Sequence, residues 1–146
     1  MRRQAGFTLL EVLVVLVIAA MAYAAVLGVP GRGISSAELK SSARTLASGL
    51  RTAQSTAMAT RRDALLTLDL DTHEFEVPGA MPPRRLPEHV DLKLFTAQSE
   101  VTSEKRGSIR FYPDGSSTGG RITVSSGERK YLVDVDWLTG RVTIEE

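Results

Sequence analysis

The sequence predicts an α+β fold, in which a long N-terminal helix, transmembrane and then amphipathic, packs on a C-terminal antiparallel β-sandwich of two sheets. Residues 7–29 are almost entirely apolar, residues 35–62 repeat apolar side chains every three or four positions, and residues 64–146 alternate apolar with polar ones. The second pattern is typical of a helix that rests one face on a core, and the third of half-buried strands. The 146 residues suffice for one compact domain beside the apolar segment.

Composition excludes several classes of protein. Hydrophobic residues make up 42% of the chain and charged residues 24%, which is typical of a globular protein rather than a disordered one. The formal net charge is +1, and without residues 1–6 it becomes −1, with 16 basic against 17 acidic side chains. Such a balance gives no electrostatic footprint for nucleic acid. The chain has no cysteine, so disulfides and thiolate metal sites are excluded.

The apolar segment 7–29 is long enough to cross a bilayer. As a helix it would extend about 34 Å, against a hydrocarbon core of ~30 Å. Arg2 and Arg3 precede it, which predicts a cytoplasmic N-terminus and export of the rest. Two alternatives remain at this point, an ordinary secretory signal cut after the small-x-small site Ala22-Tyr23-Ala24 and a plain uncleaved anchor.

Glu11 is the unusual residue of this segment. A carboxylate near the centre of a membrane helix costs roughly 2.5–3.5 kcal/mol, so it needs a reason to be there. One interpretation is that Glu11 merely reaches back to the membrane edge. The other is that a cation pairs with it, because a buried charge is tolerable when it is paired.

A second helix is predicted after a break. Residues 28–33 contain one proline and three glycines, which predicts a kink or a short unwound stretch. Ser35 followed by Glu38 matches a capping box that restarts a helix, expected to end between Thr60 and Asp63. Its narrow, alanine-rich stripe favours close packing on a sheet over a coiled coil. The stripe comprises Leu39, Ala43, Leu46, Ala47, Leu50, Ala53 and Ala57.

Short strands are predicted from residue 64 onward, where the apolar period changes to two. A turn is expected at Asp71-Thr72, a loop over residues 78–87, and a polar, mobile connection over residues 98–107. Turn signals between the strands indicate antiparallel sheets. The alternating apolar positions are Leu66, Leu68 and Leu70; Val90, Leu92 and Leu94; Ile109 and Phe111; Ile122 and Val124; Val133 and Val135; and Val142 and Ile144, with a further strand over residues 73–77.

The N-terminal residues carry a resemblance. The sequence GFTLLE at residues 6–11, behind a basic leader and before an apolar helix, resembles the class III signal of type IV pilins and pseudopilins. The resemblance implies that a membrane peptidase cuts between Gly6 and Phe7 and methylates the new amine of Phe7. It also implies that Glu11 faces the N-terminal amine of a neighbouring subunit in the filament. The chain then divides into a leader 1–6, a transmembrane and filament-core helix 7–29, and a pilin-like periplasmic domain 30–146.

The C-terminal half sharpens this resemblance. The run FYPDGSSTGG at 111–120, followed by VDWLTGRV at 135–142, is similar to the H-type minor pseudopilins of type II secretion and to their minor-pilin relatives. Physically, both motifs are turn chemistry. Trp137 is expected to pack in the core or at a sheet edge. The motif positions are Pro113, Asp114, Gly115, Gly119, Gly120, Trp137, Thr139 and Gly140.

The resemblance implies a minor pseudopilin that assembles near the tip of the periplasmic pseudopilus and helps to export folded proteins across the outer membrane. Its partners would be the other minor pseudopilins, the major pseudopilin, the prepilin peptidase and the assembly platform of the inner membrane, where the chain would be single-pass with its C-terminal domain in the periplasm. The alternative is a minor pilin of a type IV pilus, in priming or DNA uptake. Three basic pairs, at 84–85, 105–106 and 129–130, keep that alternative open, while the acidic C-terminus argues against DNA.

No residues predict catalysis, and neither a cofactor nor a metal is expected. His73 and His89 lack partners at a catalytic spacing, and the glycine-rich run 115–120 has no lysine and helix after it, as a phosphate loop requires. Asp134 and Asp136 alternate with apolar residues and are expected to face solvent. Because some pseudopilins bind calcium, carboxylates near the C-terminal loops are the one alternative for a metal.

Overall fold

The computed structural model describes residues 8–27 and 35–146. The chain divides into two compact units, Met1–Gly33 and Ile34–Glu146, and each is described by itself. The predicted leader 1–6, the cleavage point after Gly6 and the break at 28–33 all lie outside the described residues.

The first unit contains helix α1, Leu9–Leu27. Its sequence is apolar on all sides, and the side chains of residues 8–23 are all exposed in the single chain. The predicted membrane segment 7–29 extends past α1 at both ends and stays a prediction. Within the described residues, no helix has the length and apolarity that a membrane crossing requires.

The second unit begins with helix α2, Ser36–Thr60. The Ser35 side chain accepts a hydrogen bond from the Glu38 N–H at 3.1 Å, as the predicted N-cap requires. Arg61 ends the helix in a left-handed conformation. Every position of the predicted apolar stripe is buried, which confirms the predicted buried face of this helix. Gly49 lets α2 lie close to the sheet, because a Cβ there would come within 2.8 Å of the Phe75 ring.

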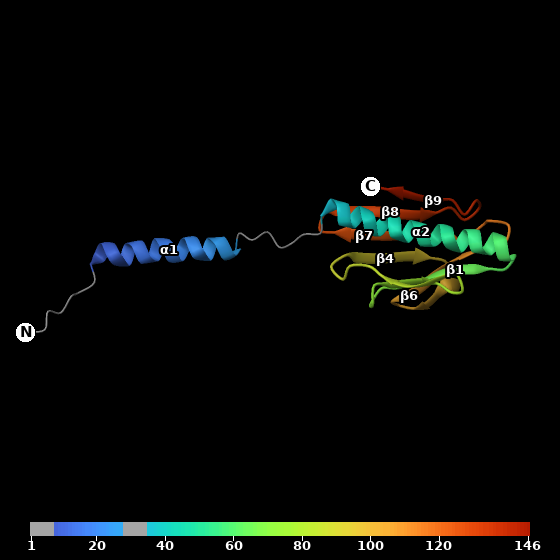
Figure 1. Cartoon of the computed structure of the whole chain (residues 1–146), viewed down its shortest axis with the longest axis horizontal. Coiled ribbons are helices and arrows are strands. Elements are labelled where there is room, and N and C mark those ends of the chain that lie inside the picture. The colour runs from blue at the N-terminus through green and yellow to red at the C-terminus, as the bar shows by residue number, and fades with distance from the viewer. Residues whose placement is uncertain (1–7, 28–34) are drawn as a thin grey trace, which may run out of the picture. The chain divides into compact units, whose positions relative to one another are not determined.

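Two antiparallel sheets complete the unit, and in Figure 1 helix α2 crosses in front of their strands. The five-stranded sheet has the order β3-β2-β1-β6-β5, and the four-stranded sheet the order β4-β7-β8-β9. The first comprises β1 (Ala64–Asp69), β2 (Glu74–Val77), β3 (Met81–Arg85), β5 (Val101–Ser103) and β6 (Arg106–Phe111). The second comprises β4 (Asp91–Thr96), β7 (Gly120–Ser126), β8 (Arg129–Val135) and β9 (Val142–Glu145).

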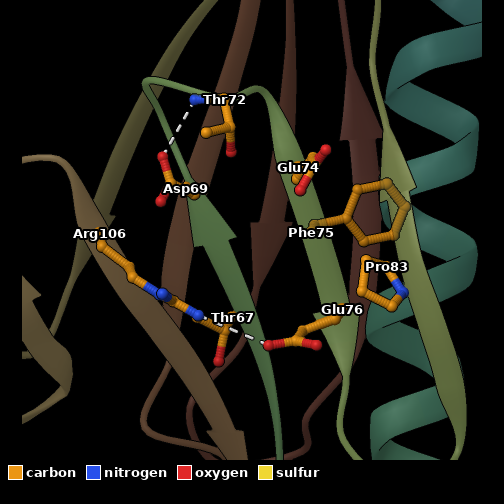
Figure 2. A pocket seen from close by; sticks show the side chains of 8 residues that line it. All are labelled: Thr67, Asp69, Thr72, Glu74, Phe75, Glu76, Pro83 and Arg106. Carbon is orange, nitrogen blue, oxygen red and sulfur yellow. Dashed lines mark hydrogen bonds and ion pairs between the residues drawn. The ribbon is translucent and has the colours of Figure 1, made fainter.

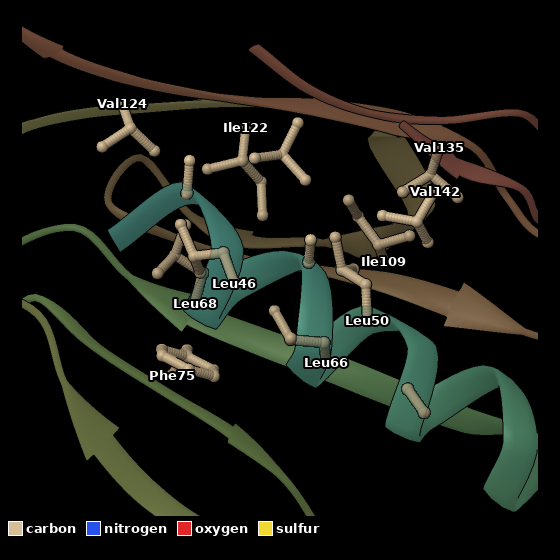
Figure 3. Packing of buried hydrophobic residues seen from close by; sticks show 14 of the residues in the cluster. Leu46, Leu50, Leu66, Leu68, Phe75, Ile109, Ile122, Val124, Val135 and Val142 are labelled. Atoms are coloured by element: carbon tan, nitrogen blue, oxygen red, sulfur yellow. The ribbon is translucent and has the colours of Figure 1, made fainter. Parts of the chain in front are cut away.

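The core lies between α2 and the inner faces of both sheets. Helix α2 contacts β1, β2 and β6 of one sheet and β7, β8 and β9 of the other. Figure 3 shows Leu46 and Leu50 of α2 between the two sets of strand side chains. The buried strand residues drawn there are Leu66, Leu68, Phe75, Ile109, Ile122, Val124, Val135 and Val142. The predicted α+β architecture is therefore confirmed.

The loop predicted over residues 78–87 is wrong in part, because residues 81–85 form strand β3. Two prolines, Pro82 and Pro83, argued against a strand. However, β3 lies at the edge of its sheet and pairs with β2 alone, so a missing backbone donor can face away from the ladder.

The mobile connection predicted over residues 98–107 is also wrong. It contains a 3₁₀ turn, η1 (Gln98–Glu100), strand β5 and the start of β6. Glu100 is buried, with its carboxylate on the guanidinium of Arg110 at 3.0 and 3.2 Å. This ion pair ties the polar segment to β6.

Candidate functional site

The start of α1 places Glu11 in a defined position. The Glu11 N–H donates to the Thr8 carbonyl at 3.1 Å and lies 3.3 Å from the Thr8 hydroxyl. Thr8 is thus the N-cap and Glu11 the third helical residue, which is the residue spacing of a capping box. The positive end of the helix dipole favours a carboxylate there. The carboxylate is exposed in the single chain, beside a helix with no polar face.

The motif residues 111–120 form the turn between β6 and β7. The Gly115 N–H donates to the Tyr112 carbonyl at 2.9 Å, which closes a β-turn with Pro113 and Asp114 at its centre. The Asp114 carboxylate accepts from the Ser116 hydroxyl and N–H, and these two bonds hold the pKa of Asp114 below its ordinary value.

Gly119 and Gly120 lead from this turn into β7. A Cβ on Gly119 would meet the Cβ of Trp137 at 3.0 Å, and one on Gly120 would meet the Phe95 carbonyl at 2.8 Å. The two glycines therefore let neighbouring strands approach closely.

The motif residues 136–141 form the turn between β8 and β9. The Asp136 carboxylate accepts from the N–H of Leu138 and from the N–H and hydroxyl of Thr139, at 2.8–3.0 Å. The hydrogen bonds from Thr139 lower the pKa of Asp136, and the bond from the Thr139 backbone N–H has the larger effect. The Gly140 N–H donates to the Asp136 carbonyl at 2.8 Å, with Gly140 in the left-handed region. Trp137 was expected in the core or at a sheet edge; it is 66% exposed, so it is not in the core, and it lies in the turn two residues past the end of β8.

Gln54 of α2 joins the two turns. Its side-chain NH₂ donates to the Gly115 carbonyl at 3.0 Å and to the Thr139 carbonyl at 3.2 Å. The Ser117 N–H also donates to the Trp137 carbonyl at 2.8 Å. The two motifs, about twenty residues apart in sequence, form one turn cluster at the end of the unit where α2 finishes (Figure 1).

The turn cluster lies inside the part of the chain that a known family covers. The sequence model of the family described as type II transport protein GspH matches residues 42–140. The chain belongs to the GspH family. The model of the prokaryotic N-terminal methylation motif matches residues 1–27, which contain Gly6, Phe7 and Glu11.

Relatives of this GspH-family chain agree with that assignment. Type II secretion system protein H of Xanthomonas campestris is 32% identical over 141 residues, which are 97% of this chain and 83% of that protein. Among solved structures, the minor pseudopilin EpsH of the Vibrio cholerae type 2 secretion system matches with a TM-score of 0.59 and 14% identity, over 74% of this chain and 96% of that one. The type IV minor pilin FimU of Pseudomonas aeruginosa matches with a TM-score of 0.57 and 14% identity, over 73% of this chain and 92% of that one. At such identities the two structures show the shared fold.

The outer face of the five-stranded sheet carries a charged hollow of about 260 Å³ (Figure 2). Its charges are occupied: Arg106 lies 3.5 Å from Glu76, and Asp69 accepts from the N–H groups of Asp71 and Thr72. Arg85 pairs with Glu74 on the same face. Within the described ranges, no three His, Cys, Asp or Glu side chains gather closely enough to hold a metal ion. This face of the GspH-family unit therefore offers solvated ion pairs rather than a ligand site.

The remaining sequence candidates lie apart. His73 Nε2 is 2.9 Å from the Val90 carbonyl, and His89 Nε2 is 3.7 Å from a Glu38 oxygen. Asp134, expected to face solvent, forms an ion pair with Arg121 on the outer face of the four-stranded sheet.

Sequence reasoning missed three residues that organise these sites: Thr8, Gln54 and Glu100. The Thr8-x-x-Glu11 spacing is a capping-box pattern and was visible in the sequence. Gln54 sits beside the apolar stripe of α2, and nothing local marks which loops it reaches. Glu100 lies in a polar run, and its role depends on its ion pair with the distant Arg110. The hydrogen bond with Glu100 raises the pKa of Arg110.

Proposed function

We propose that this chain is a minor pseudopilin of the type II secretion system that assembles near the tip of the periplasmic pseudopilus. The observation that carries the proposal is α1: an apolar helix with exposed side chains all round and a carboxylate in its first turn. Such a helix is stable only where lipid or other helices cover it. Membership of the GspH family makes the pseudopilus the natural setting.

The N-terminus would be processed before assembly. The prepilin peptidase cuts between Gly6 and Phe7 and methylates the Phe7 amine, in keeping with the methylation motif over residues 1–27. The chain then begins at Phe7, with Thr8 as the cap of α1 and Glu11 one turn further on. It stays in the inner membrane as a single-pass protein with residues 30–146 in the periplasm.

Assembly would complete the environment of Glu11. Among residues 8–27 of the first unit, the positive neighbour of the carboxylate is the helix N-terminus. In the filament the N-terminal amine of an adjacent subunit pairs with it, which makes the charge tolerable among apolar helices. The role is structural rather than enzymatic, and the other pseudopilins and the inner-membrane assembly platform are its partners.

The alternative is a minor pilin of a type IV pilus that takes up DNA. The fold of FimU favours it as much as that of EpsH favours secretion. The relative at 32% identity is a secretion protein, which favours secretion. The basic pairs are also largely occupied, since Arg85, Lys105 and Arg106 each lie within 3.5 Å of a carboxylate oxygen. DNA binding needs basic side chains free for phosphates.

Deletion of the gene, with complementation, tests the proposal. We expect the culture supernatant to lose the secreted enzymes while pilus-dependent motility and DNA uptake persist. Mass spectrometry of the complementing protein should find a methylated chain that begins at Phe7. A chain that begins at Ala25, or lost DNA uptake with normal secretion, would overturn it.

A further inference from the structure

Exposed apolar side chains gather beside the turn cluster. Five large apolar side chains are exposed among residues 35–146, and Met58, Trp137 and Leu138 are three of them, 47%, 66% and 63% exposed. Trp137 and Leu138 project from the β8–β9 turn, and the Met58 sulfur would lie 3.4 Å from a Cβ on Gly115 in the β6–β7 turn. We call these three side chains the turn patch. Singly scattered apolar residues are ordinary, whereas a gathered group on a surface indicates an interaction site.

The turn patch is held rigidly. The Asp136 carboxylate accepts three hydrogen bonds from the turn, and Gln54 fixes the turn to α2. The Trp137 carbonyl accepts from Ser117, and its Cβ lies against Gly119. A tryptophan displayed on a fixed backbone loses little freedom on binding, which is the property of an interface anchor.

An open hollow next to the turn patch contains charged side chains. Trp137 and Arg141 line an open hollow of about 400 Å³ together with Asp134 and Asp136. Asp134 is paired with Arg121, and Asp136 is engaged by its own turn. Among the described residues, Arg141 has no carboxylate within ion-pair distance, although its charge helps to lower the pKa of the nearby Asp136. The hollow thus suits a partner that brings a carboxylate next to an apolar side chain.

The size of the turn patch selects the kind of partner. The three residues expose on the order of 400 Å². A stable complex between free proteins buries about 800 Å² on each side, so the turn patch alone holds neither a second copy nor a soluble protein. It contributes when another interaction already keeps the partner close. In the proposed function the neighbouring subunits are held together through their N-terminal helices.

We propose that the turn patch docks the globular domain of the adjacent pseudopilin in the filament, which sets an apolar side chain on Trp137 and a carboxylate on Arg141. The inference rests on the proposed function. The chain enters the globular unit at Ser36, and Gln54 lies 18 residues further along α2, about 27 Å away at 1.5 Å per residue. The turn patch is therefore remote from the start of α2, and docking there would add a second contact to that of the N-terminal helices.

Thiol labelling tests the docking, because the natural chain has no cysteine. Leu138→Cys places one thiol in the turn patch, and Val101→Cys is the matched control, a 48% exposed apolar residue on the edge strand β5. Full-length variants in membranes are treated with a bulky maleimide, with and without co-expression of the other pseudopilins of the same organism. We expect labelling of Leu138→Cys to slow several-fold when the partners are present, and labelling of Val101→Cys to stay the same.

The outcomes separate the two proposals. If the partners co-purify but the maleimide labels Leu138→Cys equally fast with and without them, the docking is overturned and the proposed function stands. Equal slowing at both thiols, or slow labelling of Leu138→Cys in the chain alone, also overturns the docking. If no pseudopilin co-purifies with the wild type, the proposed function fails as well.

Truncation of the Trp137 side chain gives a second measurement. Trp137→Ala keeps the Cβ beside Gly119 and the carbonyl that accepts from Ser117, so the thermal midpoint should not change. Recovery of partner pseudopilins should fall about tenfold, as for a buried interface tryptophan. Val101→Ala is the control and should leave recovery unchanged. Equal recovery with both variants would contradict the docking.

Discussion

Glu11 donates its backbone N–H to Thr8, so the residue serves its own helix before it meets any partner. The helix dipole also favours its carboxylate, but by less than the cost of burying the charge among apolar helices. Two functions therefore meet in one residue, a local one at the helix start and an intermolecular one in the filament. The charge matters to the second more than to the first, because glutamine can also occupy the third position of a capping box.

Gly140 provides a prediction at the residue scale. Its φ is +62°, and a Cβ there would overlap the Gly115 carbonyl oxygen. We expect Gly140→Ala to lower the free energy of unfolding by about 3 kcal/mol, because backbone strain adds to a clash that separates the two turns. Urea unfolding of residues 35–146 measures it.

Gly127→Ala is the matched control, with a φ of +61° and open space around the site. It should cost only about 1 kcal/mol, the strain alone. Equal losses for the two variants would mean that the turns do not depend on close approach at Gly140.

At the residue scale, the sequence predicted features that depend only on residues close in sequence. The Ser35 cap was predicted from the sequence, whereas the exposure of Trp137, expected in the core or at a sheet edge, was not. The turn that exposes it depends on Asp136, Gly140 and the distant Gln54. No sequence pattern states that Gln54 lies beside those loops.

Helices and strands with a regular repeat of apolar side chains were predicted well, and strands without such a repeat were not. The stripe of α2 and the alternation in β1, β7 and β8 each reflect one buried face. Strand β3 was hidden by its prolines, and β5 by its polar sequence. Both lie at sheet edges, where one neighbour suffices and the usual strand composition is not required.

The turns give a pH prediction. Thr139 lowers the pKa of Asp136 in the folded chain relative to the ordinary value of 3.8, so deprotonated Asp136 favours folding. This contribution is complete above about pH 4 and is lost as the pH falls through the lower, folded pKa. We expect Asp136→Asn to lower stability at pH 7 and to reduce the loss of stability between about pH 4 and pH 2.

Urea unfolding at a series of pH values checks this. Asp114 and Asp69, whose pKa values are also lowered by turn hydrogen bonds, still titrate in the variant, so part of the acid loss should remain. If Asp136→Asn loses stability in acid as steeply as the wild type, the carboxylate does not stabilise the turn.

The whole molecule joins a unit that buries its own core to a helix that buries nothing by itself. All core residues of the sandwich come from residues 39–142, so we expect a chain that starts at Ser35 to be soluble, folded and rich in β-structure. Circular dichroism and a cooperative thermal transition measure this. Aggregation or mostly coil on removal of residues 1–34 would contradict it.

Variants at position 11 test the central claim, that the chain enters a filament through a paired charge. Full-length wild type, Glu11→Ala, Glu11→Gln, Glu11→Asp and Thr8→Ala are compared by recovery of partner pseudopilins from membranes and by secretion. We expect Glu11→Ala and Glu11→Gln to remain in the membrane but to lose partners and secretion, because an uncompensated amine among apolar helices costs several kcal/mol. Glu11→Asp should retain part of both, and Thr8→Ala, which removes only the cap, should keep both near wild type. Partner recovery by Glu11→Gln at the wild-type level would show that the charge is not needed and would contradict the account.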